Sequence, residues 1–115
     1  MEGPAAGEVV ILPFPFADQT AHKLRPALVV SSWRFGAGHD CLVAMITSRP
    51  SKDVPTVVLA ASDFVRGGLP QLSYVRPWYL LAPAASLIQG VQGRVTPAKF
   101  SEVCRLMRDL IPEGI

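Results

Sequence analysis

The stretch KLRPALVVS, residues 23–31, decides the fold of this chain. It opens with two cations, Lys23 and Arg25, and with Pro26, and then continues into residues typical of a buried β-strand. Pro26 suits the opening of a strand, where a missing backbone N–H is tolerated. An arginine at the start of a buried strand is held by the scaffold, so it can be aimed at a ligand.

A second stretch has the complementary arrangement, because its polar residues follow an apolar run instead of preceding it. The run LVAMI, residues 42–46, leads directly into Thr47, Ser48 and Arg49. The first strand would therefore present a cation at its start, and the second would present hydroxyls at its end. If the two strands are antiparallel neighbours, these two ends meet.

The composition favours a compact domain over a disordered chain. Half of the 115 residues are hydrophobic and 17% are charged, which predicts one domain over residues 1–115, with residues 1–6 flexible. The net charge of +2 does not by itself require a basic site. Cys41 and Cys104 lack metal-ligand spacing, so we expect no metal and two reduced thiols in a cytoplasmic protein. We expect neither a signal peptide nor a membrane span.

Apolar runs separated by turn residues predict a mainly β protein. The first run is continuous, which favours a strand that is covered on both faces. We expect strands over residues 7–13, 24–32, 41–47, 56–60 and 71–76, with 92–95 as either a link or a sixth strand. Pro77 stops the fifth of these strands, and residues 78–81 either continue it or pair elsewhere. Turns are expected over 33–40 and, as a short helical turn, over 62–68, with a short helix over 83–89. The sum is a small, mostly antiparallel β-barrel with short helices and a C-terminal α-helix.

The C-terminal helix has the clearest signal. Thr96 is a favourable N-cap, and Pro97 suits the first helical position. Apolar residues then recur at spacings of three and four, at Phe100, Val103, Cys104, Met107, Leu110 and Ile111. The opposite face would hold Lys99, Glu102, Arg105 and Asp109. We therefore expect an amphipathic helix packed on the barrel and ended by Pro112 and Gly114.

Arg25, Thr47 and Ser48 form the candidate site. Taken singly, each has a structural explanation: the arginine in an ion pair with Asp18 or Asp40, and the hydroxyls in hydrogen bonds to nearby backbone. Taken together, a guanidinium and hydroxyls can hold a phosphate and stabilise the charge that develops on it.

The two stretches above belong to a longer series whose order and spacing are similar to those of a known family. The series comprises GEVV (7–10), FPF (14–16) with Asp18, LRPALVVS (24–31), ITS (46–48), DF (63–64), GGL (67–69), SYVR (73–76) and GRV (93–95). The chain thereby resembles the MazF/PemK (Kid) family of toxins over nearly its whole length. The arginine–proline strand and the Ile–Thr–Ser strand end are the most specific parts.

The resemblance implies an SH3-like barrel of the CcdB/MazF/Kid type, acting as a homodimer and as the toxin of a type II toxin–antitoxin pair. Such toxins are metal-independent, sequence-specific endoribonucleases that cut single-stranded RNA, including mRNA, and so inhibit translation and growth. The ribose 2′-hydroxyl attacks the adjacent phosphate and leaves a 2′,3′-cyclic phosphate and a 5′-hydroxyl. No cofactor is implied. The expected partners are RNA and a MazE/PemI-like antitoxin.

The resemblance also assigns roles to residues. The family's active-site arginine falls on Arg25 and its threonine on Thr47, and a further arginine used in some members falls on Arg76. In those members a nearby aspartate assists, whereas this chain has Pro77, Trp78 and Tyr79 at the corresponding positions. The role of that aspartate is therefore not carried over to this chain.

Other residues close in sequence to the two strand ends are candidates for RNA contact, namely His22, Lys23, Ser48 and Arg49, together with Arg76. Cations at this density give affinity for the RNA backbone but do not read its sequence. Phe16 or Trp33 could stack on an unpaired base, although either side chain could equally belong to the core or to a dimer interface. His22, three residues before Arg25, has the ordinary pKa range of a proton acceptor; the alternative is a solvated loop histidine.

A dimer interface and two other functions stay open at this stage. Met45, Trp78, Leu80 and Leu81 could form the interface or the barrel interior. Instead of a ribonuclease, the chain could be a non-catalytic toxin of the same fold that binds a protein, as gyrase-poisoning toxins do. It could also be an RNA-binding relative without activity. The arginine–proline and Ile–Thr–Ser elements favour the ribonuclease.

Overall fold

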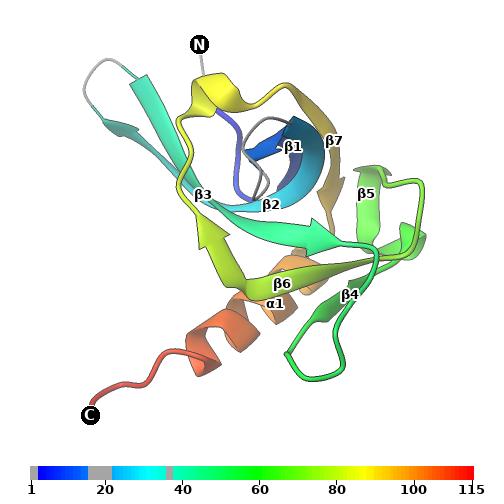
Figure 1. Ribbon diagram of the computed structural model, residues 1–115, viewed down its shortest axis with the longest axis vertical. Helices are drawn as coiled ribbons and strands as arrows, with labels where there is room; N and C mark the ends of the chain where they lie inside the picture. Colours follow the sequence, from blue (N-terminus) through cyan, green and yellow to red (C-terminus); the bar gives the residue numbers. More distant parts are fainter. Residues whose placement is uncertain (1–2, 16–21, 36–37) are drawn as a thin grey trace.

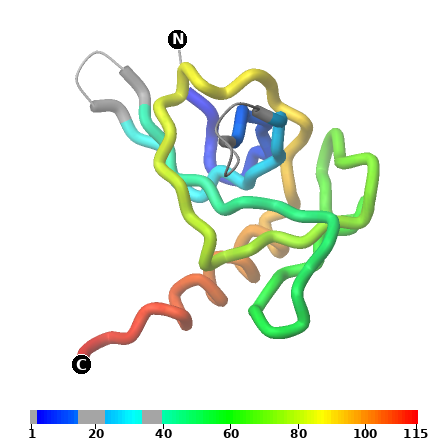
Figure 2. The backbone as a smooth tube through the Cα atoms, viewed as in Figure 1, coloured from blue at the N-terminus to red at the C-terminus, as the bar shows by residue number. Residues whose placement is uncertain are grey.

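One curled antiparallel sheet of seven strands dominates this computed structural model, which describes residues 3–15, 22–35 and 38–115 (Figure 1). The strands are β1 (Glu8–Pro15), β2 (His22–Phe35), β3 (Gly38–Thr47), β4 (Val57–Leu59), β5 (Phe64–Gly67), β6 (Ser73–Leu81) and β7 (Gly90–Val95). The described chain also contains the 3₁₀ turns η1 (Ala61–Asp63) and η2 (Ala85–Leu87) and the helix α1 (Pro97–Asp109). The strand order is β4-β6-β3-β2-β1-β7-β5, and Figure 2 shows the curl of the sheet. The predicted mainly β barrel with a C-terminal helix is confirmed.

The sheet is buried on both faces where β1, β2 and β3 pair. One apolar cluster includes Val9, Leu28 and Val103, so it joins the sheet to α1. A second cluster includes Val10 and Val29. Because successive side chains of a strand point to opposite faces, Val9 and Val10 serve different clusters. This explains the continuous apolar run of β1 and confirms that both of its faces are covered.

The start of α1 is where the sequence predicts it, but the predicted polar face is not fully exposed. The Thr96 hydroxyl accepts a hydrogen bond from the Lys99 backbone N–H at 3.1 Å, and Pro97 is the first helical residue. Lys99, expected on the polar face, is only 8% exposed. Its Nζ lies 3.0 Å from a Glu102 oxygen and 3.7 Å from an Asp63 oxygen. A buried ammonium needs such partners, and Asp63 lies too far away in sequence to reveal this one locally.

α1 is also shorter than the apolar pattern suggests. It ends at Asp109, so Leu110 and Ile111 lie beyond it and are exposed rather than packed. None of the helices in the described parts of the chain is both long and apolar enough to cross a membrane.

The turn predicted over residues 33–40 is wrong, because strand pairing continues through most of it. β2 runs on to Phe35 and β3 starts at Gly38, and these two residues pair across the hairpin. Ladder pairing here overrides the local turn preference of the glycines. The result is a longer β2–β3 arm than the sequence predicts.

The helical segments predicted over residues 62–68 and 83–89 are shorter in the structure, where only the 3₁₀ turns η1 and η2 form. After η1 the chain enters β5, which pairs with β7, so 90–95 is a strand rather than a link. The Asp63 carboxylate accepts a hydrogen bond from the Ala60 backbone N–H at 2.8 Å, which closes the turn before β5. The partner strand, not the local glycines, decides the structure of this segment.

β6 runs through Pro77, where the sequence predicts a stop, so residues 78–81 continue the strand, which is one of the two alternatives that the sequence left open. β3 pairs with β6 at Ile46↔Val75 and again at Ala44↔Leu80, so residues 76–79 lie opposite a register shift. The missing N–H of Pro77 therefore removes no ladder bond. Irregularities of this kind bend a strand, and the bend of β6 is visible in Figure 1.

Candidate functional site

A cleft of about 720 Å³ lies where β2 and β3 separate. The two strands pair only as far as Ala27↔Met45. Beyond that point β3 pairs with β6, at Thr47↔Tyr74, while the start of β2 pairs with β1, at Leu12↔Arg25. The start of β2 and the end of β3 therefore face each other across an opening. The predicted meeting of these two strand ends is confirmed.

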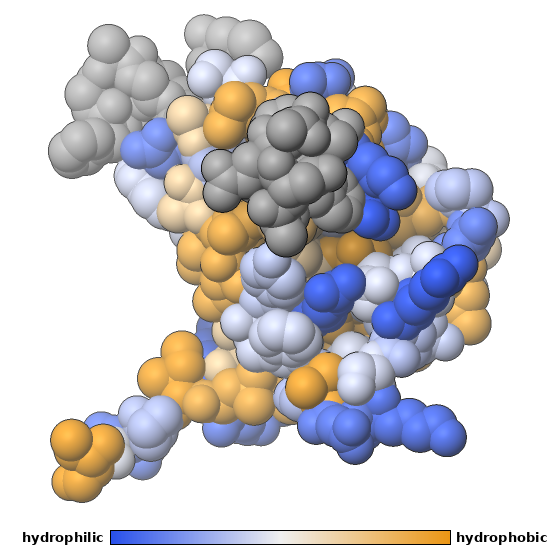
Figure 3. All heavy atoms as spheres, viewed as in Figure 1, coloured by the Kyte–Doolittle hydropathy of each residue, from blue (hydrophilic) through white to orange (hydrophobic). Residues whose placement is uncertain are grey.

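The described residues that line the cleft are strongly basic. They are four cations, Lys23, Arg25, Arg49 and Arg76; two hydroxyl residues, Thr47 and Ser48; and Phe14, Met45, Ile46, Gln71 and Tyr79. No carboxylate occurs in this set. This face of the molecule is hollowed, and hydrophilic side chains border the hollow (Figure 3). Such a cleft suits an anionic ligand.

Six of the eight residues predicted for the site from the sequence line this cleft: Lys23, Arg25, Thr47, Ser48, Arg49 and Arg76. Phe16 lies outside the described residues. His22 is the first residue of β2, but its side chain also lies outside the described part. The fold thus gathers the predicted cations and hydroxyls from β2, β6, the end of β3 and the segment that follows it. Their roles stay predictions.

Thr47 makes the local backbone contact that the sequence offered as its alternative explanation. Its Oγ1 accepts a hydrogen bond from the Arg49 backbone N–H at 3.0 Å and lies 3.4 Å from the Arg49 carbonyl oxygen. The first contact uses one oxygen lone pair, whereas the second is long for an O–H···O bond. The hydroxyl proton can therefore turn toward a ligand in the cleft, and the turn holds the Arg49 backbone beside it.

Two smaller cavities extend the cleft in different directions. One, of about 390 Å³, shares Arg25, Thr47 and Ser48 with the cleft. The other, of about 200 Å³, shares Thr47, Arg49 and Arg76 with it. Thr47 therefore lines all three spaces. A ligand that extends over several units, with an anionic group at Thr47, matches this arrangement better than a compact molecule does.

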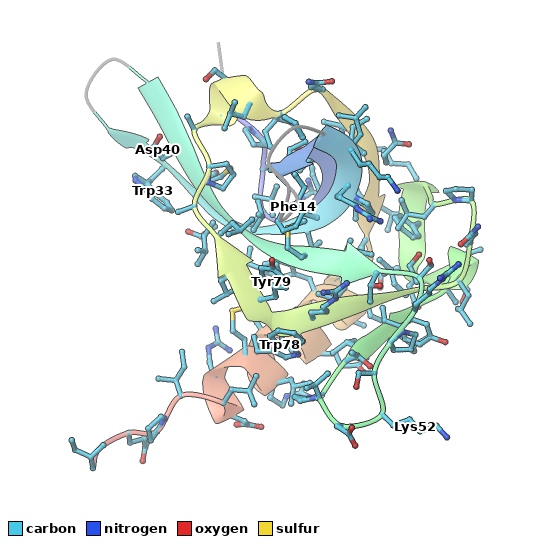
Figure 4. The ribbon with its side chains drawn as sticks, in the orientation of Figure 1. Phe14, Trp33, Asp40, Lys52, Trp78 and Tyr79 are labelled. Carbon is cyan, nitrogen blue, oxygen red and sulfur yellow. The ribbon has the colours of Figure 1, made fainter. Side chains whose placement is uncertain are left out.

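Aromatic side chains form one wall of the cleft, and this wall is what the sequence analysis missed. The Tyr79 ring lies edge-on to Phe14, with centroids 5.9 Å apart and an interplanar angle of 73°. The Arg76 guanidinium carbon lies 5.6 Å from the centroid of the Tyr79 ring, a cation–π contact. Figure 4 shows Phe14, Tyr79 and Trp78 together. The sequence left open whether residues 78–81 continue the strand past Pro77, so it did not place Tyr79 in the cleft.

The structure also places the remaining aromatic and apolar residues that the sequence singled out. Trp33 lies on the β2–β3 arm, opposite Asp40, and is absent from the described cleft lining (Figure 4). Met45 is buried in the core, whereas Leu80 and Leu81 are partly buried and pack against the first and the second apolar cluster, respectively. A role of these residues in a dimer interface stays a prediction. Trp78 is exposed.

The two thiols are not part of the cleft, and both are free. Burial raises the pKa of Cys41, and the negative charge of Asp40 raises it further. Burial also raises the pKa of Cys104, although Arg108 works in the opposite direction. Raised pKa values keep both thiols neutral near pH 7, which makes them poor nucleophiles. In the described parts of the chain, no group of three or more acidic, histidine or cysteine side chains could hold a metal ion.

Comparisons with known proteins identify the family of this chain and find its fold in solved structures. The sequence model for the PemK-like, MazF-like toxins of type II toxin–antitoxin systems matches residues 5–111. Among curated proteins, none matches this chain. The fold is similar to a chain of a MazE–MazF complex from Deinococcus radiodurans, at 24% identity and a TM-score of 0.71, covering 99% of this chain and 100% of that one.

Two mycobacterial structures share the fold as well. An endoribonuclease from Mycobacterial species matches at 20% identity and a TM-score of 0.70, over 95% of this chain and 91% of that one. An endoribonuclease in complex with its cognate antitoxin, also from Mycobacterial species, matches at 21% identity and a TM-score of 0.65, over 95% and 98%. At these identities the structural matches establish the fold, and the match to the family model over residues 5–111 establishes the family. This chain belongs to the PemK-like, MazF-like toxins of type II toxin–antitoxin systems.

Proposed function

We propose that this toxin is an endoribonuclease that cuts single-stranded RNA in the basic cleft, without a metal ion. One observation carries the proposal: the fold brings Arg25 and Thr47 from separate strands to one cleft, among two further arginines and a lysine. The similarity of this chain to structures described as endoribonucleases supports the same activity. The reaction is attack of a ribose 2′-hydroxyl on the adjacent phosphate, which yields a 2′,3′-cyclic phosphate and a 5′-hydroxyl.

Each residue has a task that its chemistry suits. Attack on a phosphate needs in-line placement, stabilisation of the developing charge and proton transfer. Arg25 supplies the stabilising charge, because a guanidinium can hold two phosphate oxygens at once. The Thr47 hydroxyl donates to another phosphate oxygen, while Lys23, Arg49 and the other cleft cations hold neighbouring phosphates.

The proton of the 2′-hydroxyl needs an acceptor. The described side chains that line the cleft are cations, hydroxyls, an amide and apolar or aromatic groups, and none of these is a good base at neutral pH. His22 begins β2 directly before Lys23, which lines the cleft. We assign His22 as the candidate acceptor, on the ordinary pKa range of its imidazole. A solvated histidine outside the reaction is the competing assignment.

The same proposal includes the partners. The neighbours described as MazE–MazF complexes and as an endoribonuclease with its cognate antitoxin support a MazE-like antitoxin for this chain. We further propose a homodimer that acts in the cytoplasm. An acidic antitoxin segment that folds on binding would compete with RNA for Arg25 and the other cleft cations.

Incubation of the purified chain with a long RNA of mixed sequence, in excess EDTA, tests this function. We expect cuts at one short recurring motif when the new 5′ ends are mapped, and no cuts by a chain that carries both Arg25→Ala and Thr47→Ala. Intact RNA after incubation with folded protein would contradict the proposal. RNA binding without cutting would then favour an inactive relative. Growth inhibition that survives both substitutions would favour a toxin that binds a protein.

A further inference from the structure

Trp78 is a large aromatic residue that is both exposed and rigidly held. Trp78 lies at the bend of β6 and is 42% exposed. The indole Nε1–H donates a hydrogen bond to the Pro55 carbonyl oxygen at 3.0 Å. The indole also stacks on Tyr79, with centroids 5.6 Å apart and an interplanar angle of 20° (Figure 4). A fixed, partly exposed aromatic surface loses little conformational entropy when it binds a ligand.

The indole lines the side cavity of about 200 Å³ that opens from the main cleft. Trp78, Pro50 and Val54 give this cavity apolar walls. Thr47, Arg49 and Arg76 line both this cavity and the cleft, so they mark the passage between them. A volume of about 200 Å³ suits one planar ring system rather than a folded peptide segment.

The chemistry of these walls selects among ligands. An unpaired nucleobase can stack on an indole while its phosphates stay with the arginines at the passage. An apolar peptide side chain would fill the cavity but leave Arg49 and Arg76 without an anionic partner from the ligand. The neighbouring cations and the aromatic wall therefore favour a nucleotide over a peptide.

We propose that Trp78 is the stacking platform for one unpaired base of the RNA, the base of the nucleotide next to the phosphate held at Thr47. This inference rests on the proposed function and adds a base-binding subsite to it. Through this subsite, Trp78 contributes to the choice of the sequence that is cut.

A binding experiment without cleavage tests the subsite on the full chain. The chain has two tryptophans, so in Trp33→Phe protein the fluorescence reports Trp78 alone. The probe is a single-stranded 2′-deoxy oligonucleotide of defined sequence with all four bases, and a set of variants with one abasic position each. We expect the probe to quench Trp78 fluorescence. We expect an abasic site at one position, and only there, to remove most of the quenching.

Two substitutions separate stacking from a structural role. Trp78→Leu removes the aromatic face, and we expect it to weaken probe binding by about 5- to 150-fold, the range for one stacked base. Trp78→Phe keeps a face but loses the bond to Pro55, and we expect it to restore affinity to within a few-fold of wild type. Thermal unfolding of both variants reports folding. Equal weakening by Phe and Leu would overturn the inference, because Trp78 would then act by holding the Pro55 segment.

The outcomes also separate this inference from the proposed function. The abasic position that removes quenching must lose its effect on affinity in Trp78→Leu, because the two changes remove one contact. If wild-type chain cuts RNA but no abasic position behaves in this way, the subsite is wrong and the function stands. If wild-type chain cuts no RNA, the proposed function fails, whereas coupling between Trp78 and one base would still support the stacking platform.

Discussion

Replacement of Arg25 by alanine is expected to lower the rate of RNA cleavage at saturating RNA by about 10²- to 10³-fold, the usual loss when one group that stabilises transition-state charge is removed. Arg25 lines both the cleft and its 390 Å³ extension, so it lies where a phosphate would be held beside Thr47. The neighbouring cations keep the RNA bound, so the loss should appear mainly in kcat. Single-turnover cleavage of a labelled oligonucleotide measures it.

Two further variants test whether the loss of activity depends on the position and geometry of the charge rather than on charge alone. Arg66→Ala removes a guanidinium of equal charge that pairs with Glu8 at 3.1 Å and does not line the described cleft. We expect it to cleave at close to the wild-type rate. Arg25→Lys keeps the charge but loses the two-pronged geometry, so its rate should lie between those of wild type and Arg25→Ala. If Arg25→Ala and Arg66→Ala cleave equally fast, the assignment of Arg25 is wrong.

The largest expected effect on stability comes from Gly67→Ala. Gly67 has a φ of +66°, which disfavours any residue with a Cβ, and a Cβ there would collide with the Gln92 carbonyl oxygen and lie 2.6 Å from the Gly93 Cα. Both contacts are backbone of β7, which cannot turn aside as a side chain could. Left-handed strain and overpacking together cost roughly 2–5 kcal/mol. We therefore expect a Tm lower by roughly 10–20 °C.

The next residue supplies a matched control. A Cβ on Gly68 meets nothing within 4 Å, and its backbone φ is not in the left-handed region. Gly68→Ala should change the Tm little, or raise it slightly by reducing the entropy of the unfolded chain. Thermal unfolding followed by circular dichroism measures both variants under the same conditions. Equal Tm values would mean that the close approach of β5 to β7 does not determine stability.

The barrel and the strand ends of the site could be predicted because their signals are local. Continuous apolar runs such as 27–30 and 42–46 predict strands covered on both faces, and both of these lie in the core strands β2 and β3. The polar residues next to each run then mark the strand ends. Antiparallel pairing of the two runs brings Arg25 and Thr47 into one cleft.

The parts that were not predicted depend on contacts between distant segments. Lys99 is buried because Asp63 of η1 lies beside it, and helical periodicity alone places such a residue on the polar face. β6 continues through Pro77 because β3 shifts register opposite it. This continuation brings Tyr79 into the cleft wall and Trp78 to the side cavity. A proline in a sequence marks the end of a strand more often than a bend. The sequence therefore left open whether residues 78–81 continue the strand, and it gave no local signal for the aromatic half of the site.

The most direct test of the account is a single-atom change in the substrate. An RNA oligonucleotide with the mapped motif is compared with the same oligonucleotide that carries one 2′-deoxy sugar on the 5′ side of the cut, both in EDTA. We predict that the all-ribose strand is cut to a 2′,3′-cyclic phosphate and a 5′-hydroxyl, and that the deoxy strand stays intact while it still binds. Cutting of the deoxy strand at the same bond would contradict attack by the 2′-hydroxyl, and with it the proposed chemistry of the cleft.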